Sequence, residues 1–426
     1  MTDSRTEMST FDGDAAAPAF SFTTESELDD VLAPVRKAAE NTSTQLPFVR
    51  SMTRRVLGHL ETNTLDVAED VLIAPADVFT SVERFTADRA MMRRSPHVVA
   101  WGGEILEPGD YTTKDVAGTP VLLLRDKDGC ARAFANICAH RGAQVASGCG
   151  RASRFTCPYH AWSYDLNGRL ASLPQRRMFE GVDVSGLGLR PLPVAEQAGL
   201  IVLGLDESVS LDGFLDDALD DLAGFGFDRY AHAQSMVLHL RANWKLAVDV
   251  NFEGYHFPFL HKDTLAPIVT NNSVFDLFGP HCRWAFPFRN IEDLRDLPEQ
   301  DWPDRFSGSV VYGIFPSCVL VESPVSTLML RIYPGDTPGT CVVHMHGGAL
   351  HPMRDDADRL LAQAGFDGAT AVLRDEDFPA AEECQRGVEH GLESIIFGRA
   401  EPLVQHLHGQ WDAAIEERTA DGQARS

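Results

Sequence analysis

Short hydrophobic runs, separated by polar turn-forming residues, occupy the second quarter of the chain. From His97 onward, VVAWGGEI, TPVLLLRDKDGCARAFANI, RFTCPYHAWSYDLNGRLASL and LPVAEQAGLIVLGL are rich in β-branched and aromatic residues. The turn signals DKDG, SGCG and DLNG separate these runs. The pattern predicts a small all-β domain over residues 96–205.

Helical patterning precedes this domain. The segments TESELDDVLAPVRKAAE and VERFTADRAMMRR predict an N-terminal helical arm over residues 26–95. Thr24 or Ser26 is the expected N-cap, followed by acidic residues in the first turn. Residues 1–25 are rich in Ser, Thr, Asp and Ala, and we expect them to be disordered.

The remaining residues, 206–426, mix both kinds of pattern. An acidic helical segment, LDGFLDDALDDLAGF, is followed by predicted strands at MVLHLRANW, CRWAFPFRN, SVVYGIFPSCVLVES, TLMLRIYPGD and TCVVHMHGGAL. A long helical section is expected from about Asp355 to the end. Helices placed before and after a group of strands indicate an α+β domain, so the predicted fold class is α+β.

Length and composition narrow the function. The 426 residues favour two domains, and the net charge of −25 argues against nucleic acid, whose binding proteins need basic patches. Simple solubility is the plainer reading of that charge, and docking to a partner with a basic surface is the alternative. No run of eighteen apolar residues predicts a membrane span, and the N-terminus lacks a secretory pattern, so we expect a cytoplasmic protein. Eight cysteines in such a chain indicate thiols or metal ligands.

Two cysteine–histidine pairs stand in the β-rich domain. Cys138 and His140 form a C-x-H pair, Cys157 and His160 form a C-x-x-H pair, and sixteen residues separate the pairs. Two thiolates and two imidazoles suit a tetrahedral zinc ion or a 2Fe–2S cluster in which histidines hold one iron. Unliganded cysteines with core histidines are the third alternative. Zinc fingers usually keep both histidines in one pair, so the split arrangement favours the Rieske centre.

The sequence CAHRGAQ…CPYHAWSYDLNGRL closely resembles the cluster loops of Rieske-type non-haem iron oxygenases. The resemblance implies that Cys138 and Cys157 bind one iron and that His140 and His160 bind the other. By itself this motif does not separate an oxygenase from an electron-carrying ferredoxin. Cys149 lies outside the motif, and we expect it to be a packing residue.

A second group of candidate ligands lies in EGYHFPFLH, residues 253–261. Pro258 denies a helix its regular continuation, so the broken segment can aim His256 and His261 at one point. The longer stretch NWKLAVDVNFEGYHFPFLHKDTL resembles the mononuclear-iron segment of the same family. The resemblance implies that both histidines bind iron and that Glu253 is the carboxylate bridging the two metal centres. Phe257 and Phe259 are the expected walls of a water-poor cavity.

Non-haem Fe(II) oxygenases need a carboxylate as third ligand, which leaves positions open for oxygen. In LRDEDFPAAEECQRGVEHG, Asp377 precedes Gln385 by eight residues, as the family's ligand precedes its glutamine. Asp375 and Glu376 are the alternatives within the same acidic run. The run would also suit a solvated helix start, where acidic residues are favoured.

The resemblance covers roughly residues 95–410 and implies a Rieske 2Fe–2S domain followed by a helix-grip-type catalytic domain. Its implied function is that of a terminal oxygenase using O2 and electrons from NAD(P)H, delivered by a flavin/iron–sulfur reductase or a ferredoxin. A homotrimer, with or without a β subunit, is the implied assembly. The glutamate at position 253 resembles that of oxygenases acting on carnitine-like and choline-like quaternary amines. Ring-dihydroxylating members of the family usually carry aspartate at this position. The family's asparagine is displaced, since Val250 follows Asp249, and no role is assigned to Asn251.

Two function classes therefore compete with amine oxidation. One is an aromatic-ring-hydroxylating dioxygenase, and the other is a Rieske electron carrier or zinc-stabilised protein without oxygenase activity. For several further residues the sequence allows either a role in a functional site or ordinary packing in the core. Tyr159 and Trp162 are expected to shield the cluster, and His344 and His346 to face one side of a strand, with packing the simpler explanation. A cation-binding or substrate-lining role competes with strand core for Phe275, Phe278, Trp284, Phe286 and Phe288.

Overall fold

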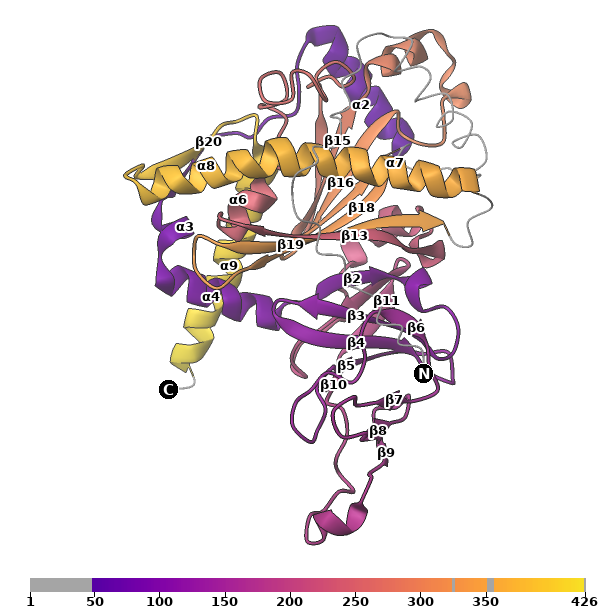
Figure 1. Ribbon diagram of the computed structural model, residues 1–426. Helices are drawn as coiled ribbons and strands as arrows, with labels where there is room; N and C mark the ends of the chain where they lie inside the picture. The colour runs from indigo at the N-terminus through magenta and orange to yellow at the C-terminus, as the bar shows by residue number, and fades with distance from the viewer. Residues whose placement is uncertain (1–47, 324–325, 351–355, 425–426) are drawn as a thin grey trace.

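The computed structural model describes residues 48–323, 326–350 and 356–424 (Figure 1). The segment 1–25, which was predicted to be disordered, lies outside the described residues. The first predicted helix of the arm and its expected N-cap, Thr24 or Ser26, also lie outside them. The described chain is α+β, as predicted, with a β-rich domain below a larger mixed domain in the view of Figure 1. The two are joined without a long linker, because β13 of the larger domain begins only 27 residues after β12 ends.

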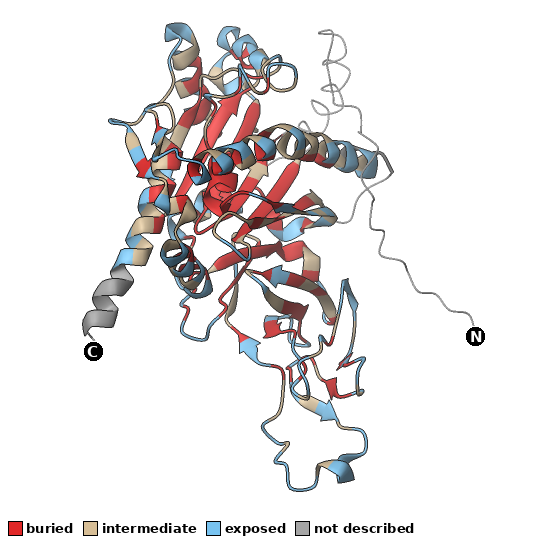
Figure 2. Cartoon of the chain, turned by 60° about the vertical axis from the view of Figure 1, so that its left-hand side comes forward, coloured by how far each residue is buried: buried red, intermediate tan, exposed pale blue. Residues whose placement is uncertain are grey.

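The β-rich domain contains three small sheets, with strand orders β10-β5-β4-β3-β6, β11-β12-β2 and β7-β8-β9. Their strands are β2 (His97–Trp101), β3 (Asp110–Val116), β4 (Thr119–Arg125), β5 (Ala131–Ala135), β6 (Cys149–Arg151), β7 (Phe155–Thr156), β8 (Ser163–Tyr164), β9 (Leu170–Ser172), β10 (Pro191–Leu192), β11 (Val194–Gln197) and β12 (Leu200–Leu203). Short 3-10 turns, η1 (Gly102–Ile105) and η2 (Arg176–Phe179), interrupt them. The loops around β7, β8 and β9 project from the body, and Figure 2 shows them largely exposed.

The larger domain is built on a seven-stranded antiparallel sheet in the order β13-β19-β18-β17-β16-β15-β14. Its strands are β13 (Tyr230–Leu240), β14 (Val274–Phe278), β15 (His281–Pro287), β16 (Gly308–Ile314), β17 (Cys318–Glu322), β18 (Thr327–Pro334) and β19 (Cys341–Leu350). Every residue of β15 and β16 is buried, so both faces of the sheet are covered there. Neither strand alternates between buried and exposed positions, and β15 buries the polar His281 and the charged Arg283 as well as its apolar residues.

Helices cover this sheet. The helices α7 (Asp356–Val372) and α8 (Phe378–Glu389) run across one face as one rod, joined by a π-helical turn, η7 (Leu373–Asp377) (Figure 1). The other helical elements of the domain are η3 (Asp216–Ala218), α5 (Leu219–Ala223), η4 (Phe227–Arg229), α6 (Trp244–Asp249), η5 (Arg289–Asp296), η6 (Glu299–Asp301) and α9 (Pro402–Ala424). The acidic segment expected to be helical thus forms only η3 and α5.

The described part of the arm is not wholly helical, which corrects the prediction for residues 26–95. Between α2 (Val49–Thr62) and the helices α3 (Asp77–Thr80) and α4 (Val82–Arg94), the strand β1 (Leu72–Pro75) pairs with β20 (Ser394–Phe397). The partner strand, SIIF, is more than 300 residues away along the chain. A four-residue strand carries too little periodicity to be recognised without that partner.

One apolar core runs from the β-rich domain into the larger one, and it includes Val99, Leu123, Trp244 and Leu330. A separate core lies under the projecting loops and contains Cys138, Cys157 and Tyr164. The domains are also held together by polar contacts, since Arg331 of β18 donates to the backbone oxygen of Asp115 at 2.8 Å. The two candidate metal-binding regions therefore sit on one packed framework.

Candidate metal centres

The two cysteine–histidine pairs lie at the tips of two similar loops. Backbone bonds close the first loop between Cys138 and Ala143, and the second between Cys157 and Trp162. Both cysteines are buried, and the imidazole rings of His140 and His160 lie edge to face, with centroids 4.5 Å apart. The folding of these loops is local, because every closing bond spans six residues or fewer.

The donor atoms in these loops fit a 2Fe–2S cluster. The Nδ1 atoms of His140 and His160 are buried, and neither has a hydrogen-bond partner among the described residues. A buried nitrogen without a partner costs free energy, and two neighbouring imidazoles with two buried cysteines supply the donor types of a Rieske centre. The structure thus places the two imidazoles side by side, on loops whose cysteines belong to one buried core.

Aromatic residues surround this group. The indole of Trp162 is buried and stacks on the His140 ring at 4.8 Å, with 6° between the planes. Tyr159 lies 3.8 Å from the His160 ring but keeps 59% of its surface exposed, so it covers one side of that ring only. The Tyr164 hydroxyl lies 3.1 Å from Cys138 Sγ and accepts from the Ala139 amide. This hydroxyl contact was not predicted from the sequence.

Cys149 was predicted to be a packing residue, and that prediction is wrong. It lies on β6 at the edge of its sheet, and its side chain is exposed. Edge strands have one unpaired flank, so an alternating pattern there does not bury every apolar position.

His256, His261 and Asp377 converge on one point. The Nε2 atoms of the two histidines are 3.0 Å apart, and Asp377 Oδ1 lies 3.1 Å from His261 Nε2 and 3.3 Å from His256 Nε2. Among the described residues, no other group of three or more potential ligands meets so closely. The helix α6 ends at Asp249, and a series of turns through Pro258 carries both imidazoles to this point. The donor set matches the two-histidine, one-carboxylate geometry of non-haem Fe(II) sites.

A second carboxylate stands behind each imidazole. Glu253 hydrogen-bonds Nδ1 of His256, and Glu376 accepts from Nδ1 of His261 at 2.5 Å. Each carboxylate accepts a hydrogen bond from the Nδ1–H of its histidine, so the Nε2 lone pair of that histidine is free to face a metal ion. Burial lowers the pKa of His256, but hydrogen bonds to Asp377 and Glu253 outweigh it and raise the pKa to about 9. This negative environment favours a cation between the imidazoles.

The two alternatives to Asp377 have other positions. Glu376 reaches the far side of His261 and also accepts from the Thr264 hydroxyl at 2.8 Å. Asp375 pairs with Arg374 on the surface. The π-helical turn η7 sets these directions, because successive side chains point to different sides of a helix. Asp377 alone of the three is buried against both imidazoles.

Aromatic side chains form one wall beside these histidines. Phe257 is buried, and its ring lies 5.6 Å from those of His261 and Trp284 and 5.2 Å from that of Phe286. Phe259, by contrast, is 71% exposed, so its prediction as a cavity wall is wrong for the single chain. Of the two rings that flank Pro258, one is therefore in the core and the other in solvent.

Only part of the predicted aromatic cluster lies beside the candidate site, and the histidine pair His344 and His346 lies elsewhere. Of the five aromatic residues between 275 and 288, Trp284 and Phe286 contact Phe257, whereas Phe278 packs against Arg283 elsewhere. His344 and His346 do share one side of β19, with parallel rings 6.5 Å apart. His346 contacts Arg331 at 2.9 Å at the junction of the two domains, so packing and interdomain contact explain the pair.

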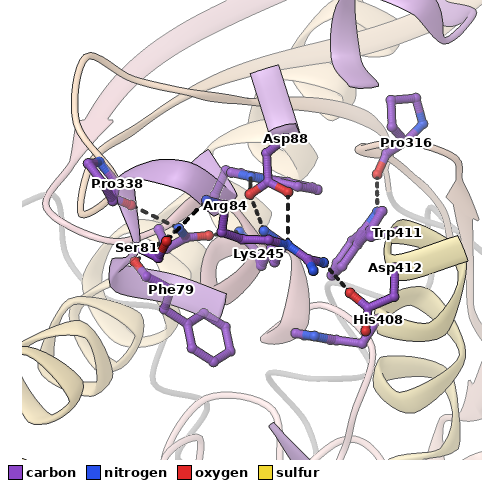
Figure 3. Close-up of polar contacts among 12 residues, drawn as sticks. Phe79, Ser81, Arg84, Asp88, Lys245, Pro316, Pro338, His408, Trp411 and Asp412 are labelled. Carbon is purple, nitrogen blue, oxygen red and sulfur yellow. Dashed lines mark hydrogen bonds and ion pairs between the residues drawn. The ribbon is translucent and has the colours of Figure 1, made fainter. Parts of the chain in front are cut away.

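A buried polar network around Lys245 and Asp88 was not predicted from the sequence (Figure 3). Lys245 and Asp88 form a fully buried ion pair, and Trp244 donates to the same carboxylate at 3.2 Å. Burial lowers the pKa of Lys245 to about 8. Farther along α6, Asp249 contacts His408 of α9 at 3.1 Å. These bonds tie the arm and α9 to α6, the helix from which the histidine loop departs.

No helix in the described part of the chain has both the length and the apolar composition that crossing a bilayer requires.

Comparisons with known proteins agree with this geometry. The family model for the Rieske [2Fe-2S] domain matches residues 96–187, and that for the ring hydroxylating alpha subunit (catalytic domain) matches residues 227–417. The Rieske match favours an iron–sulfur cluster over structural zinc.

Similar proteins of known function were also found. A carnitine monooxygenase oxygenase subunit from Acinetobacter pittii is 35% identical over 334 residues, which cover 74% of this chain and 85% of the relative. Chloroplastic choline monooxygenase from Spinacia oleracea is 29% identical over 75% of this chain and 73% of its own length.

Solved structures share the architecture. The quaternary ammonium Rieske monooxygenase CntA with L-carnitine aligns with a TM-score of 0.66 at 25% identity, over 81% of this chain and 96% of that one. Naphthalene 1,2-dioxygenase from Rhodococcus sp. aligns with a TM-score of 0.65 at 17% identity, over 87% and 98%, which shows a shared fold alone. Together with the two family matches, the 35% identity to an oxygenase subunit shows that this chain belongs to the Rieske-type ring-hydroxylating oxygenase family, as an oxygenase (alpha) subunit.

Proposed function

We propose that this chain is the terminal oxygenase of a system that hydroxylates or oxidatively demethylates a small quaternary amine. Its electrons come from NAD(P)H through a flavin/iron–sulfur reductase or a ferredoxin, and its place is the cytoplasm. One observation carries the proposal: two imidazoles and a carboxylate converge beside an aromatic wall, on the same chain as a Rieske donor set. The named activities of the carnitine and choline relatives support the substrate class.

Each predicted ligand has a role in this proposal. Cys138, His140, Cys157 and His160 hold the 2Fe–2S cluster, and His256, His261 and Asp377 hold the ferrous ion. When bound, the cluster supplies single electrons and the ferrous ion supplies the oxygen chemistry. The net monooxygenation inserts one atom of O2 into a C–H bond and reduces the other to water, using two electrons and two protons.

The chain's own residues orient and isolate this chemistry. Glu253 and Glu376 hold the Nδ1 protons of the two histidines, which keeps each Nε2 aimed at one point. Phe257 and its aromatic neighbours exclude water from that side. We assign no proton transfer to the carboxylates beyond these shared hydrogen bonds.

The aromatic wall suits a quaternary ammonium group. Trp284 and Phe286 lie 4.6 Å apart next to Phe257, and indole faces attract cations. The buried Asn271 Oδ1 has no hydrogen-bond partner in the described residues, and it lies by Gly254, where an added Cβ would be 2.4 Å from it and 3.2 Å from the Trp284 ring. An unpaired carbonyl dipole beside aromatic faces favours positive charge.

A homotrimer is the proposed assembly. Large apolar side chains are exposed at two places: Tyr255 (63%) and Phe259 on the histidine loop, and Tyr159 and Met178 (77%) on the projecting Rieske loops. If these surfaces meet, the Rieske loops of one subunit pack against the histidine loop of the next. Glu253 then bridges His140 or His160 of one subunit and His256 of its neighbour.

Metal analysis tests the class of protein first. About three irons and two acid-labile sulfides per chain are expected. About two irons would indicate an electron carrier, and zinc without sulfide would contradict both.

A substrate panel tests the reaction. Purified protein with a surrogate reductase is offered betaines and arenes, and product is measured beside substrate-dependent NADH use. Oxidation of a betaine supports the proposal. Selective oxidation of an arene would support the second candidate, a ring-hydroxylating dioxygenase; naphthalene 1,2-dioxygenase shares the fold of this chain.

A further inference from the structure

The segment that bears the Rieske loops has a charge opposite to that of the rest of the chain. Residues 130–190 contain eight arginines and three acidic residues, a net charge of +5, which leaves −30 for all other residues. All eight guanidinium-bearing residues are exposed: Arg132, Arg141, Arg151, Arg154, Arg169, Arg176, Arg177 and Arg190. A basic surface on a strongly acidic protein concentrates the attraction for an acidic partner at one place.

Most of this positive charge is not neutralised internally. Within the described ranges, only Arg132 and Arg151 of the eight form ion pairs, with Asp126 and Asp110. Of the three acidic residues, Asp165 accepts backbone N–H bonds in a turn and Asp183 binds Ser185. The Arg169 guanidinium has no ion pair or side-chain hydrogen bond among the described contacts.

Arg169 lines a cleft of about 490 Å³ together with Arg132 and Asn167. The floor is apolar and comes from the paired strands β5 and β10, where Ala133 stands opposite Leu192. Two guanidinium groups and an amide around an apolar floor suit the carboxylates and apolar contacts of a protein surface.

The turn that carries Arg169 is held firmly on this floor. Gly168 adopts a φ of +76°, and a Cβ there would lie 2.4 Å from the Phe134 ring. The preceding Asp165 closes the turn by accepting from the amides of Asn167 and Arg169 at 2.9 and 3.0 Å. Glycine permits this close approach, so Asn167 and Arg169 are fixed on either side of it at the cleft.

The floor of the cleft leads directly to the cluster loops. Phe134 belongs to the same apolar core as Cys138 and Cys157. Five residues of chain separate Ala133 from Cys138, a span of at most about 17 Å. A carrier seated on the cleft is therefore brought near the thiolate side of the cluster site.

We propose that the cleft between Arg132 and Arg169 is the docking site of an acidic one-electron iron–sulfur carrier that reduces the Rieske cluster. The inference rests on the proposed function, which needs such a donor. One electron passes from a ferrous iron of the carrier, which becomes ferric, to one ferric iron of this chain's cluster, with no bond made or broken. Charge complementarity selects the partner and speeds its association.

The test uses reversal of charge at Arg169, whose side chain has no ion pair within the described part of the chain, and an acidic plant-type ferredoxin as the probe. At low salt, Arg169→Glu is expected to weaken binding of oxidised ferredoxin, and to slow reduction of the cluster by reduced ferredoxin, each by about tenfold or more. Arg93→Glu on α4, an exposed arginine outside residues 130–190, is the matched control and changes both by less than about twofold. Added salt weakens the wild-type interaction more than that of the variant.

Equal affinity and equal reduction rates in wild type and Arg169→Glu would overturn the docking site. If Arg169→Glu does not assemble the cluster, Arg169→Gln takes its place, with an expected loss of about threefold and the same overturning result. Dithionite-reduced protein mixed with O2 and substrate bypasses the carrier. Failure to form product there counts against the proposed function, whereas normal product with an unchanged ferredoxin interaction counts against the docking site alone.

Discussion

The two candidate metal-binding regions of this chain are built in opposite ways. The Rieske donors come from 23 consecutive residues on projecting loops, and their Nδ1 atoms have no protein partner in the described chain. The mononuclear set joins a short loop to an aspartate 116 residues away, and a carboxylate holds each histidine from behind. One region is locally folded and open, whereas the other is assembled by tertiary packing and enclosed.

The difference follows from what each region does in the proposed function. A centre that exchanges electrons with other proteins must lie near the surface, and a local loop can present it there. A centre that activates oxygen must exclude water, so it needs walls and ligands from several elements. The comparison predicts that single changes behind the mononuclear histidines alter that metal and leave the Rieske loops intact.

The largest effect is expected from Asp377→Ala. Among the described residues, Asp377 is the one carboxylate in contact with both Nε2 atoms, so its removal should empty the mononuclear site and lower turnover by more than about 1000-fold, beyond the 10–100-fold typical of outer partners. About two irons per chain and the Rieske spectrum should remain. Asp375→Ala is the control, because Asp375 pairs with Arg374 at the surface. A third iron retained in Asp377→Ala would contradict the assignment.

Next in size is Glu253→Gln, which separates electron transfer from metal binding. The amide keeps the shape but loses the charge that holds the His256 Nδ1 proton, so both metals should stay bound while turnover falls about 100-fold. The measurement is iron content together with the rate of cluster oxidation in a single turnover. Glu401→Gln removes a nearby charge that has no bond to His256, and serves as control. Full activity in Glu253→Gln would remove the bridging role.

A smaller effect is expected from Glu376→Gln. Its carboxylate holds His261, so the variant should bind mononuclear iron about 10–100-fold more weakly while the Rieske spectrum is unchanged. Iron affinity is measured by competition with a chelator. Thr264→Val removes only the second hydrogen bond to Glu376 and should have a lesser effect. Unaltered affinity in Glu376→Gln would mean that the carboxylate does not orient the ligand.

The same contrast explains why some of the candidate ligands could be predicted from the sequence. The Rieske donors and the two histidines of EGYHFPFLH could be named because each set lies within a short segment. Within the acidic run at 375–377, the family resemblance selected Asp377 by its spacing from Gln385, with Asp375 and Glu376 as the alternatives. Only the π-helical turn determines that Asp377 faces the imidazoles while Glu376 reaches behind His261.

What the sequence did not predict depends on distant partners. The pairing of β1 with β20 and the contacts Lys245–Asp88 and Asp249–His408 join residues more than 150 positions apart. Phe259 is apolar yet exposed, because irregular turns have no periodicity from which a buried side can be derived.

The smallest effect is expected at the Rieske loops. There a neutral hydroxyl, that of Tyr164, contacts a candidate ligand, whereas in the other region the contacts come from the carboxylates of Glu253 and Glu376. Tyr164→Phe keeps the ring but removes the hydrogen bond to Cys138 Sγ at 3.1 Å. The reduced cluster carries one more negative charge and gains more from that bond. The variant's reduction potential should therefore fall by about 40 mV, the one-electron equivalent of about 1 kcal/mol.

Protein-film voltammetry measures this potential, and Tyr159→Phe is the control, because that exposed ring contacts His160 by its face. A shift below about 10 mV is expected in the control, since it loses no hydrogen bond to a cluster sulfur. An unchanged potential in Tyr164→Phe would show that the hydroxyl does not donate to the thiolate. In that case the Rieske region would be tuned by its exposure to solvent, and the contrast with the carboxylate-held mononuclear site would be sharper still.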